Sequence, residues 1–252
     1  MASPRRITST PSFVTERAVL LAGGAFLFAV AALSWPDGDG GIWVYALSFW
    51  NYLIYVAAFA FRAVSVERFR LDAMVTRSVA LTVLALVYLP GLSSLLSLVV
   101  VACGFALNAS AVMALGSKRT YYGFELDALP PVHVTRFPYS VTAHPMLLGN
   151  LIGFGGTLLD PAFRQDWWPL AVLHLVGNGT VLVMEARGKP PSVHWPLGGL
   201  LATALLIALH SPAGGPAAVG WFVLCTAFGL VVIATYARRP REGRSPTVPH
   251  HA

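Results

Sequence analysis

Long apolar runs without charge restrict this chain more than any other feature. A helix needs roughly 20 apolar residues to cross a bilayer. Several runs of about that length contain no Asp, Glu, Lys or Arg: residues 18–35, 42–61, 78–117, 137–159, 167–184 and 190–237. The third run is long enough for two crossings with a break at "LPGLSS", and the last for two with a break at "HSPAGGP". The sequence therefore predicts an all-α, polytopic integral membrane helical bundle with about eight transmembrane helices.

The composition excludes an ordinary water-soluble domain. Only 11% of the 252 residues are charged, and the mean hydropathy is +0.66, whereas soluble domains carry about 25% charged residues. The first apolar run lacks a small-residue cleavage site, so we expect no cleavable signal peptide. The two cysteines, Cys103 and Cys225, fit no disulfide or metal spacing and are predicted to be packing residues.

Basic residues predict the orientation. They gather in alternate connections, where positive charge marks the cytoplasmic side, and the residues concerned are Arg5, Arg6, Arg17, Arg62, Arg68, Arg70, Arg77, Lys118, Arg119, Arg136, Arg187, Lys189, Arg238, Arg239, Arg241 and Arg244. We expect cytoplasmic termini, disordered basic tails at 1–16 and 238–252, and a transmembrane domain at 17–237. The net charge of +6 is explained by this bias and by anionic lipid, without nucleic acid or a protein partner.

Polar residues inside the sixth predicted helix form a stripe. His174, Asn178 and Glu185 are spaced i, i+4 and i+11, which places them on one face at 3.6 residues per turn. Such groups are costly in a membrane and suggest function. The stripe either lines a polar cavity or makes hydrogen bonds between helices. Glu185 lies at the cytoplasmic end, where solvation in the interface is a further alternative.

The fifth predicted helix carries the complementary pattern. Pro145, Gly149, Gly153 and Gly156 follow i, i+4, i+8 and i+11, which leaves one side without bulky side chains. That side either receives a neighbouring helix or leaves room for a flat ligand. Pro145 suits a first helical turn, whose unpaired N–H groups would accept a carboxylate, and Asn150 lies about two turns inside. The preceding helix contributes a further pair at i and i+4, Gly104 and Asn108.

The connection 117–143 is long, aromatic and basic, a composition that favours the headgroup layer. Loops of this length are often functional, so we predict an interfacial gate. It brings Tyr139, Arg136 and His144 towards Glu185 on the cytoplasmic side. The residues alone thus indicate a site for a polar small molecule that faces a lipid-accessible second substrate.

Residues 113–159 resemble the core of the phosphatidylethanolamine and phospholipid N-methyltransferases, which are related to isoprenylcysteine carboxyl methyltransferases. The motifs that carry the resemblance are "ALG" at 114–116, "YYG" at 121–123, "VTRFPY" at 134–139 and "HPMLLG" at 144–149. The family pattern has NPMY where this chain has His144 to Leu147. Its GxG motif is reduced to Gly104, and its paired glutamates to Glu185. By helix order the resemblance extends over about 78–190 and leaves the helices of 195–237 unaccounted for.

The resemblance implies a membrane enzyme that uses S-adenosylmethionine. It implies catalytic roles for Tyr139 and His144 and no metal. The cofactor-binding set that it suggests is Gly104, Tyr122, Gly123, His144, Pro145, Met146, Gly149, Asn150, Asn178 and Glu185. In this interpretation Glu185 binds the cofactor's ribose hydroxyls or amino group, and the rings of Tyr122 and Tyr139 stabilise an ammonium headgroup. Methyl transfer mainly requires two reactants to be held in line and shielded from water.

Three functions stay open at this stage. The first is methyl transfer to a lipid or other membrane-soluble acceptor, with a phospholipid amine as the best single guess. The second is a transporter or lipid-binding protein without catalysis, favoured by the missing second glutamate and the additional helices. The third is a membrane oxidoreductase, suggested by His174 and His210.

Overall fold

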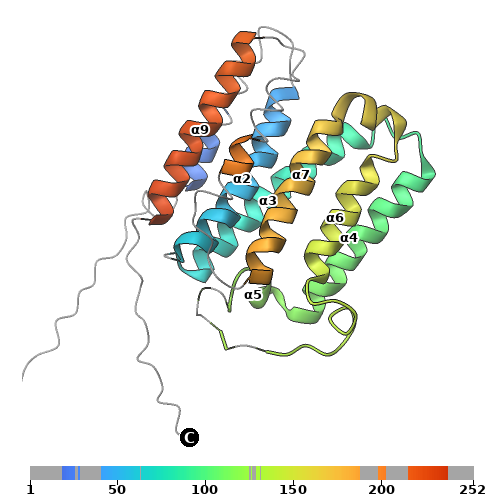
Figure 1. The fold of residues 1–252 in the computed structure, drawn as a ribbon, viewed down its shortest axis with the longest axis vertical. Coiled ribbons are helices and arrows are strands. Elements are labelled where there is room, and N and C mark those ends of the chain that lie inside the picture. The colour runs from blue at the N-terminus through green and yellow to red at the C-terminus, as the bar shows by residue number, and fades with distance from the viewer. Residues whose placement is uncertain are drawn as a thin grey trace, which may run out of the picture.

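The computed structural model describes residues 19–25, 28, 41–62, 64–124, 126, 129–130, 132–187, 198–202 and 215–237. Within these ranges every regular element is a helix, which confirms the all-α prediction (Figure 1). The helices with defined bounds are α2 (Gly41–Phe61), α3 (Val66–Tyr88), α4 (Leu95–Leu115), α5 (Ser117–Thr120), α6 (Pro145–Thr157), α7 (Pro161–Arg187) and α9 (Gly215–Ala237). The tails at 1–16 and 238–252, and most of the crossings predicted near 18–35 and 195–210, lie outside the described residues.

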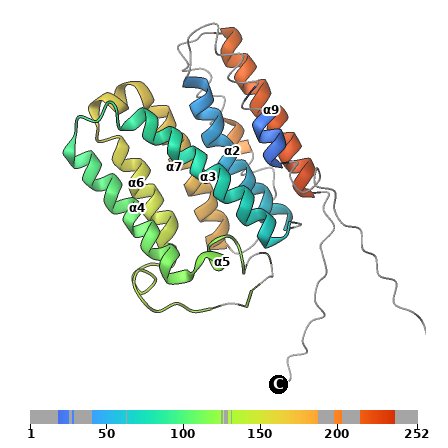
Figure 2. The same cartoon turned by 180° about the vertical axis from the view of Figure 1, so that it is seen from behind.

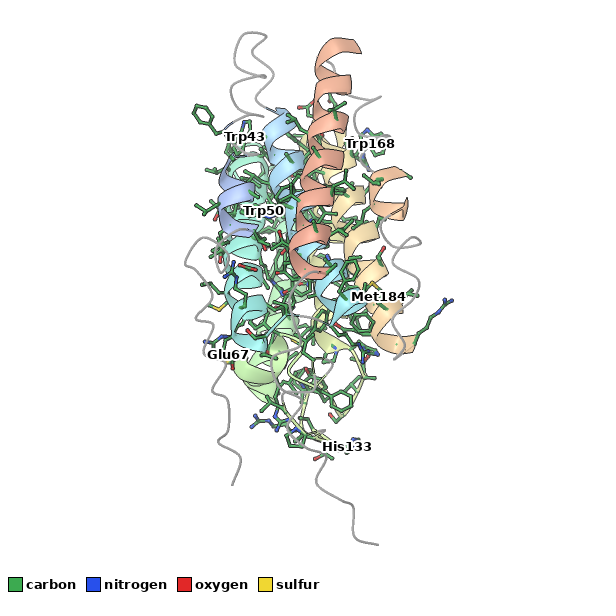
Figure 3. The ribbon with its side chains drawn as sticks, turned by 90° about the vertical axis from the view of Figure 1, so that its left-hand side faces the viewer. Trp43, Trp50, Glu67, His133, Trp168 and Met184 are labelled. Atoms are coloured by element: carbon green, nitrogen blue, oxygen red, sulfur yellow. The ribbon has the colours of Figure 1, made fainter. Side chains whose placement is uncertain are left out.

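Four of the described helices are long and apolar enough to cross a membrane: Trp43–Phe61, Val66–Tyr88, Leu95–Leu115 and Pro161–Arg187. They support an integral membrane protein, while the total number of crossings and the cytoplasmic termini stay predictions. Tryptophans mark one end of the bundle in Figure 3, where Trp43 and Trp168 lie far from Glu67 and His133. We call the end that carries the connection 116–144 the loop end.

Helix α2 is the centre of the bundle and packs against α3, α7 and α9, as the two opposite views show (Figures 1 and 2). Its side chains Phe49, Ile54 and Phe59 have no solvent exposure. The ring of Trp50 meets Phe228 of α9 edge-on, with centroids 5.6 Å apart. A helix that is apolar all round is expected at such a position.

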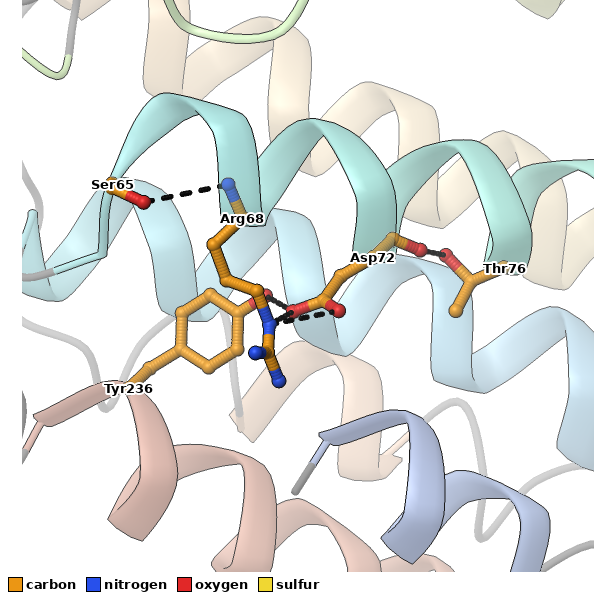
Figure 4. Close-up of polar contacts among 5 residues, drawn as sticks. All are labelled: Ser65, Arg68, Asp72, Thr76 and Tyr236. Atoms are coloured by element: carbon orange, nitrogen blue, oxygen red, sulfur yellow. Dashed lines mark hydrogen bonds and ion pairs between the residues drawn. The ribbon is translucent and has the colours of Figure 1, made fainter. Parts of the chain in front are cut away.

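Helix α9 is fastened to α3 by a buried polar cluster (Figure 4). The hydroxyl of Tyr236 donates to Asp72 Oδ2 at 2.8 Å, and Arg68 Nε lies 3.3 Å from Asp72 Oδ1. Thr76 Oγ1 donates to the Asp72 carbonyl oxygen at 2.9 Å. Since Asp72 is fully buried, the Tyr236 bond and the Arg68 ion pair offset the cost of its charge. The last described helix is therefore part of the same bundle.

The start of α3 corrects the prediction that the basic residues of segment 62–77 lie in a connection between helices. The helix begins at Val66, so Arg68, Arg70 and Arg77 are helical. Ser65 caps the helix by accepting a bond from the Arg68 amide at 3.4 Å, and Glu67 lies in the first turn, where acidic residues are favourable. The prediction equated charge with a loop, although arginine is a good helix former. Arg77 thereby moves from a loop into a membrane-spanning helix.

Helix α7 also begins earlier than the predicted Trp167, at Pro161. Asp160 explains this start, because its carboxylate accepts bonds from the amides of Phe163 at 3.1 Å, Ser93 at 2.7 Å and Ser94 at 2.8 Å. Desolvation opposes the charge, but these hydrogen bonds outweigh it and lower the pKa of Asp160 to about 2. The carboxylate ties the α3–α4 turn to the α6–α7 turn at the end opposite the loop end.

The α4–α6 pair explains the glycine stripe. A Cβ atom on Gly104 would lie 2.3 Å from the Gly153 amide nitrogen, and one on Gly149 would lie 2.6 Å from the Gly104 carbonyl oxygen. The two helices thus meet backbone to backbone, which only small residues allow. The opposite face of α4 is exposed at Leu95, Leu96 and Met113. Cys103 lies on this face and is exposed, so its predicted packing role is wrong.

Candidate active site

The start of α6 and the end of α7 meet at the loop end of the bundle. His144 is the N-cap residue of α6, and Pro145 is its first helical residue, as the sequence predicts. His144 Nδ1 lies 3.5 Å from Glu185 Oε2, which is an ion pair whenever the imidazole is protonated. Their side chains are 31% and 21% exposed, so both reach a surface from which a polar ligand can enter. The predicted meeting of these two residues is what the structure shows.

Tyr139 belongs to the same region. Its hydroxyl oxygen is inaccessible to solvent and has no hydrogen-bond partner among the described residues. Burial and, to a smaller degree, the Glu185 carboxylate raise the pKa of Tyr139 to about 12. The phenol is therefore neutral at physiological pH and keeps a proton to donate. A buried hydroxyl without a partner is uncommon in folded proteins and points to a group that binds there.

The first turn of α6 leaves backbone donors unpaired. No side chain caps this helix start, and helix geometry gives the first N–H groups no partner within the helix. The turn is held in place through the Met146 carbonyl oxygen, which accepts a bond from Asn108 Nδ2 of α4 at 2.9 Å. Pro145, Met146 and His144 thus form a fixed wall beside Glu185.

Deeper in the bundle, a chain of hydrogen bonds joins four helices. Asn150 Nδ2 of α6 donates to Asn178 Oδ1 of α7 at 2.9 Å. Asn178 Nδ2 donates to the Tyr52 hydroxyl of α2 at 2.7 Å, and that hydroxyl shares a 2.8 Å bond with His174 Nδ1. Arg77 Nη2 of α3 donates to Asn150 Oδ1 at 3.0 Å. The predicted stripe on α7 therefore does make interhelical hydrogen bonds.

His174 and Asn178 also line a cavity, so both interpretations of the stripe hold for these two residues, whereas Glu185 does not line it. The cavity lining is Asn51, Tyr52, Tyr55, Arg77, Ala80, Leu81, Leu147, Asn150, Phe154, His174, Asn178 and Val181. Leu147 lies about one turn from His144, and Val181 about one turn from Glu185, so the cavity lies about one helical turn inward of the His144–Glu185 pair. We call it the polar cavity. The sequence does not identify Tyr52 or Arg77 as site residues. Tyr52 lies in a long apolar run, and Arg77 is one of the basic residues assigned to a connection.

Comparison with known protein families decides what this arrangement is. Residues 92–187 match the family model described as phospholipid methyltransferase. This segment is therefore similar to a phospholipid methyltransferase domain. No curated protein and no solved structure matches the chain. The matched segment runs from the turn before α4 to the end of α7 and agrees with the resemblance carried by its motifs.

Within the methyltransferase domain, two residues of the predicted cofactor set have another role. Tyr122 is 3% exposed and stacks on Phe69 of α3, with ring centroids 5.0 Å apart and an interplanar angle of 6°. Its ring belongs to the core and anchors the loop, so the predicted contact with an ammonium group is not supported. Gly123 is buried beside it, and its carbonyl oxygen accepts a bond from the Leu129 amide at 2.8 Å.

The domain's glycines and Arg136 also serve packing. Gly104 and Gly149 contact the backbone of the neighbouring helix, which corrects the prediction that they line a ligand groove. Arg136 donates to the carbonyl oxygens of Met113 at 3.2 Å and Ala114 at 2.7 Å, so it caps the end of α4 and does not join His144. Asn150 and Asn178 line the polar cavity of the domain.

His174 bears on the oxidoreductase alternative. Its ring stacks on Phe154 with centroids 4.0 Å apart and an interplanar angle of 1°, it is 1% exposed, and one nitrogen is bonded to Tyr52. The geometry is that of a packed core histidine. His210, the second residue behind that alternative, lies outside the described residues.

Proposed function

We propose that this protein is an integral membrane methyltransferase that uses S-adenosylmethionine and methylates a lipid or membrane-soluble acceptor, with a phospholipid amine as the preferred acceptor. The observation that carries the proposal is the meeting of His144 and Glu185 at 3.5 Å. His144 precedes the first residue of α6 and Glu185 lies near the end of α7, so the two ends of this helical hairpin meet inside the segment that matches the phospholipid methyltransferase family. The positive-inside pattern puts this end at the cytoplasmic face, where a soluble cofactor is available.

The residues at the loop end fit this cofactor. Its charged groups need a carboxylate acceptor, which Glu185 offers, and hydrogen-bond donors, which the Tyr139 hydroxyl and the uncapped first turn of α6 offer. Tyr139 supplies a buried donor without a partner among the described residues. Of the predicted cofactor set, we retain His144, Pro145, Met146, Asn150, Asn178 and Glu185.

When bound, S-adenosylmethionine supplies an electrophilic methyl group on a sulfonium. The protein's own task is to place a nucleophile in line with that group and to exclude water. An amine must lose a proton in the course of the reaction, and the His144 imidazole is the base at this site that can accept it. The Glu185 carboxylate beside Nδ1 fixes the orientation of the ring.

The binding test uses radiolabelled S-adenosylmethionine and detergent-purified full-length protein. We expect saturable binding by the wild type and a loss of roughly tenfold or more in affinity for Glu185→Ala, as for a charged hydrogen-bonding partner. His144→Ala should weaken binding less. Glu67→Ala and His133→Ala are matched controls, because both residues are exposed and neither is assigned to the site, and they should bind like the wild type. No saturable binding by the wild type would sink the methyltransferase proposal.

Acceptor identity is read from a second assay in the same preparation. The wild type is reconstituted with total membrane lipid, and labelled methyl groups are followed into the lipid fraction. Incorporation into the amine of phosphatidylethanolamine supports the phospholipid assignment. Cofactor binding without any lipid labelling removes that acceptor and leaves a different membrane-soluble one. Neither binding nor transfer favours a non-catalytic transporter or lipid-binding protein.

A further inference from the structure

We propose that Arg77 binds the phosphate of the lipid acceptor, and that the cleft between α3 and α4 holds one of its acyl chains. This inference rests on the proposed function and adds the residues that select the substrate. Arg77 lies outside the segment matched by the phospholipid methyltransferase family, so it is a contribution of α3 to the domain's site.

Arg77 is a cation inside a membrane-spanning helix. It lies eleven residues after the start of α3, within the apolar span Val66–Tyr88, about 16 Å along the helix axis. Arg77 forms no ion pair with a carboxylate among the described residues. It does bond to a neutral amide oxygen on Asn150. An intramembrane charge is costly and marks a functional site, and the guanidinium fork suits a phosphate.

Two different spaces meet at Arg77. The polar cavity lies on one side, and a second, apolar cleft lies on the other, lined by Arg77, Leu81, Leu84, Ala85, Tyr88, Leu89, Leu98, Val101, Phe105, Asn108 and Thr157. Arg77 and Leu81 line both. The cleft has a volume of about 420 Å³, within the usual range of ~300–1,000 Å³ for ligand pockets. A ligand that spans both spaces has a polar head and an apolar tail, with an anion at the junction.

The cleft opens between two helices that are consecutive in sequence. Helix α4 packs on α6 and α5, whereas it makes at most marginal contact with α3. Leu89 at the rim is 55% exposed, and the walls are aliphatic and aromatic. In a bilayer, hydrocarbon is what such walls face. A lipid chain can therefore enter sideways between α3 and α4 without leaving the membrane.

The order of the residues along the bundle follows the order of the parts of an aminophospholipid. Asn150, which Arg77 contacts, lies six residues after His144, or ~9 Å along α6. A phosphate at Arg77 therefore directs its amine through the polar cavity towards His144 and Glu185. The acyl chain leaves in the opposite direction, along the α3–α4 cleft. Arg77 then binds the phosphate, the polar cavity faces the amine, and the α3–α4 cleft holds the acyl chain of one lipid molecule.

The experiment uses full-length protein in nanodiscs, S-adenosylmethionine, and a phosphatidylethanolamine probe that carries a photoreactive diazirine in one acyl chain. We expect peptide mapping to find saturable labelling on cleft residues such as Leu84 and Leu98. Labelling should fall roughly tenfold or more in Arg77→Gln, as for loss of a charged hydrogen bond. A diacylglycerol probe has the same photoreactive chain and no phosphate. It should label the wild-type cleft as weakly as the phosphatidylethanolamine probe labels Arg77→Gln. Arg70→Gln is the matched control, because Arg70 is two turns away on α3 and lines neither space.

A second variant guards against misfolding. Arg77→Lys keeps the charge but loses the planar fork, and it should give intermediate labelling at an unchanged melting temperature. Equal labelling of wild type and Arg77→Gln would overturn the proposal, as would labels confined to the exposed face of α4. A loss of S-adenosylmethionine binding in Arg77→Gln with labelling intact would assign Arg77 to the cofactor carboxylate instead. If the enzyme proposal alone fails, cleft labelling persists in a wild type that transfers no methyl group.

Discussion

Helix α4 lies along the chain between helices α3 and α6, and of these two it packs closely against only α6. It is separated from α6 by the long connection 116–144, yet the two helices touch backbone to backbone through Gly104 and Gly149. It is separated from α3 only by the turn at residues 89–94, yet a cleft lies between them. Chain connection therefore does not decide which membrane helices pack. Small residues do, because they let backbones approach where no hydrophobic force between helices exists.

The two interfaces of α4 also differ in the residues that they contribute. The closed interface fixes the first turn of α6, and with it His144, by the bond from Asn108 to the Met146 carbonyl oxygen. The open interface has large side chains such as Leu84, Leu98 and Phe105 on its walls and Arg77 at its inner end. In the proposed mechanism, one side of α4 positions the reacting groups and the other side admits the lipid.

The largest expected effect comes from one added methyl group on the closed side. Gly104→Ala places a Cβ at 2.3 Å from a backbone nitrogen of Gly153, so the helices must separate and we expect little folded protein. Gly179→Ala is the matched control, because nothing lies within 4 Å of its new Cβ, and replacing a helical glycine by alanine stabilises by about 0.5–1 kcal/mol. Thermal unfolding in detergent measures both. A Gly104→Ala protein as stable as the wild type would show that the backbone contact is not needed.

On the open side, a much larger addition should leave the fold intact. Ala85→Phe places a ring in the α3–α4 cleft, so we expect a melting temperature within about 2 °C of the wild type. The transfer of labelled methyl groups to phospholipid should fall about tenfold, because the ring displaces the acyl chain. Leu86→Phe is the control, since Leu86 is 59% exposed and does not line the cleft. Equal activity of the two variants would argue against the cleft as the lipid path.

Acid should destabilise the end of the bundle opposite the loop end, where Asp160 joins the α3–α4 turn to the α6–α7 turn. The pKa of Asp160 is about 2 in the folded protein, against an ordinary value of 3.8. Its contribution to stability is therefore complete above about pH 4 and is lost as the pH falls towards 2. Asp160→Asn should lower the melting temperature at pH 7 by on the order of 5 °C and flatten this part of the acid profile.

The exposed Asp166 is the control for that measurement. Asp166→Asn, only six residues further along the chain, should leave both the melting temperature and the acid profile close to those of the wild type. If the two variants behave alike, the hydrogen bonds to Asp160 do not stabilise the turns.

The smallest expected effect lies in the network beneath the site. Tyr52→Phe removes the hydroxyl that accepts from Asn178 and meets His174. Single hydrogen bonds inside membrane bundles contribute modestly, so we expect a loss of about 1 kcal/mol, or about 2–4 °C in melting temperature. Tyr45→Phe, on the same helix and outside the polar cavity, serves as the comparison. A loss as large as that of Gly104→Ala would mean that the network, rather than the glycine contact, holds the helices together.

The sequence predicted the closed side of α4 well and the open side poorly. Pro145 as a helix start, the glycine stripe and the meeting of His144 with Glu185 all follow from local rules of spacing and helix capping. Arg77 could not be found in that way, because a charge at the edge of an apolar run looks like a loop residue until its tertiary partners are known. The same limit applies to Tyr122, whose motif position suggests a ligand while three-dimensional packing buries it against Phe69.

The central claim is that the His144–Glu185 pair marks the active site of a lipid methyltransferase. The most direct test is the transfer of labelled methyl groups from S-adenosylmethionine to phosphatidylethanolamine by purified protein in nanodiscs, for the wild type, Glu185→Ala and the control Glu67→Ala. We expect methylated phospholipid from the wild type and Glu67→Ala, and at least a tenfold lower rate from Glu185→Ala. Equal rates for all three proteins would contradict the account.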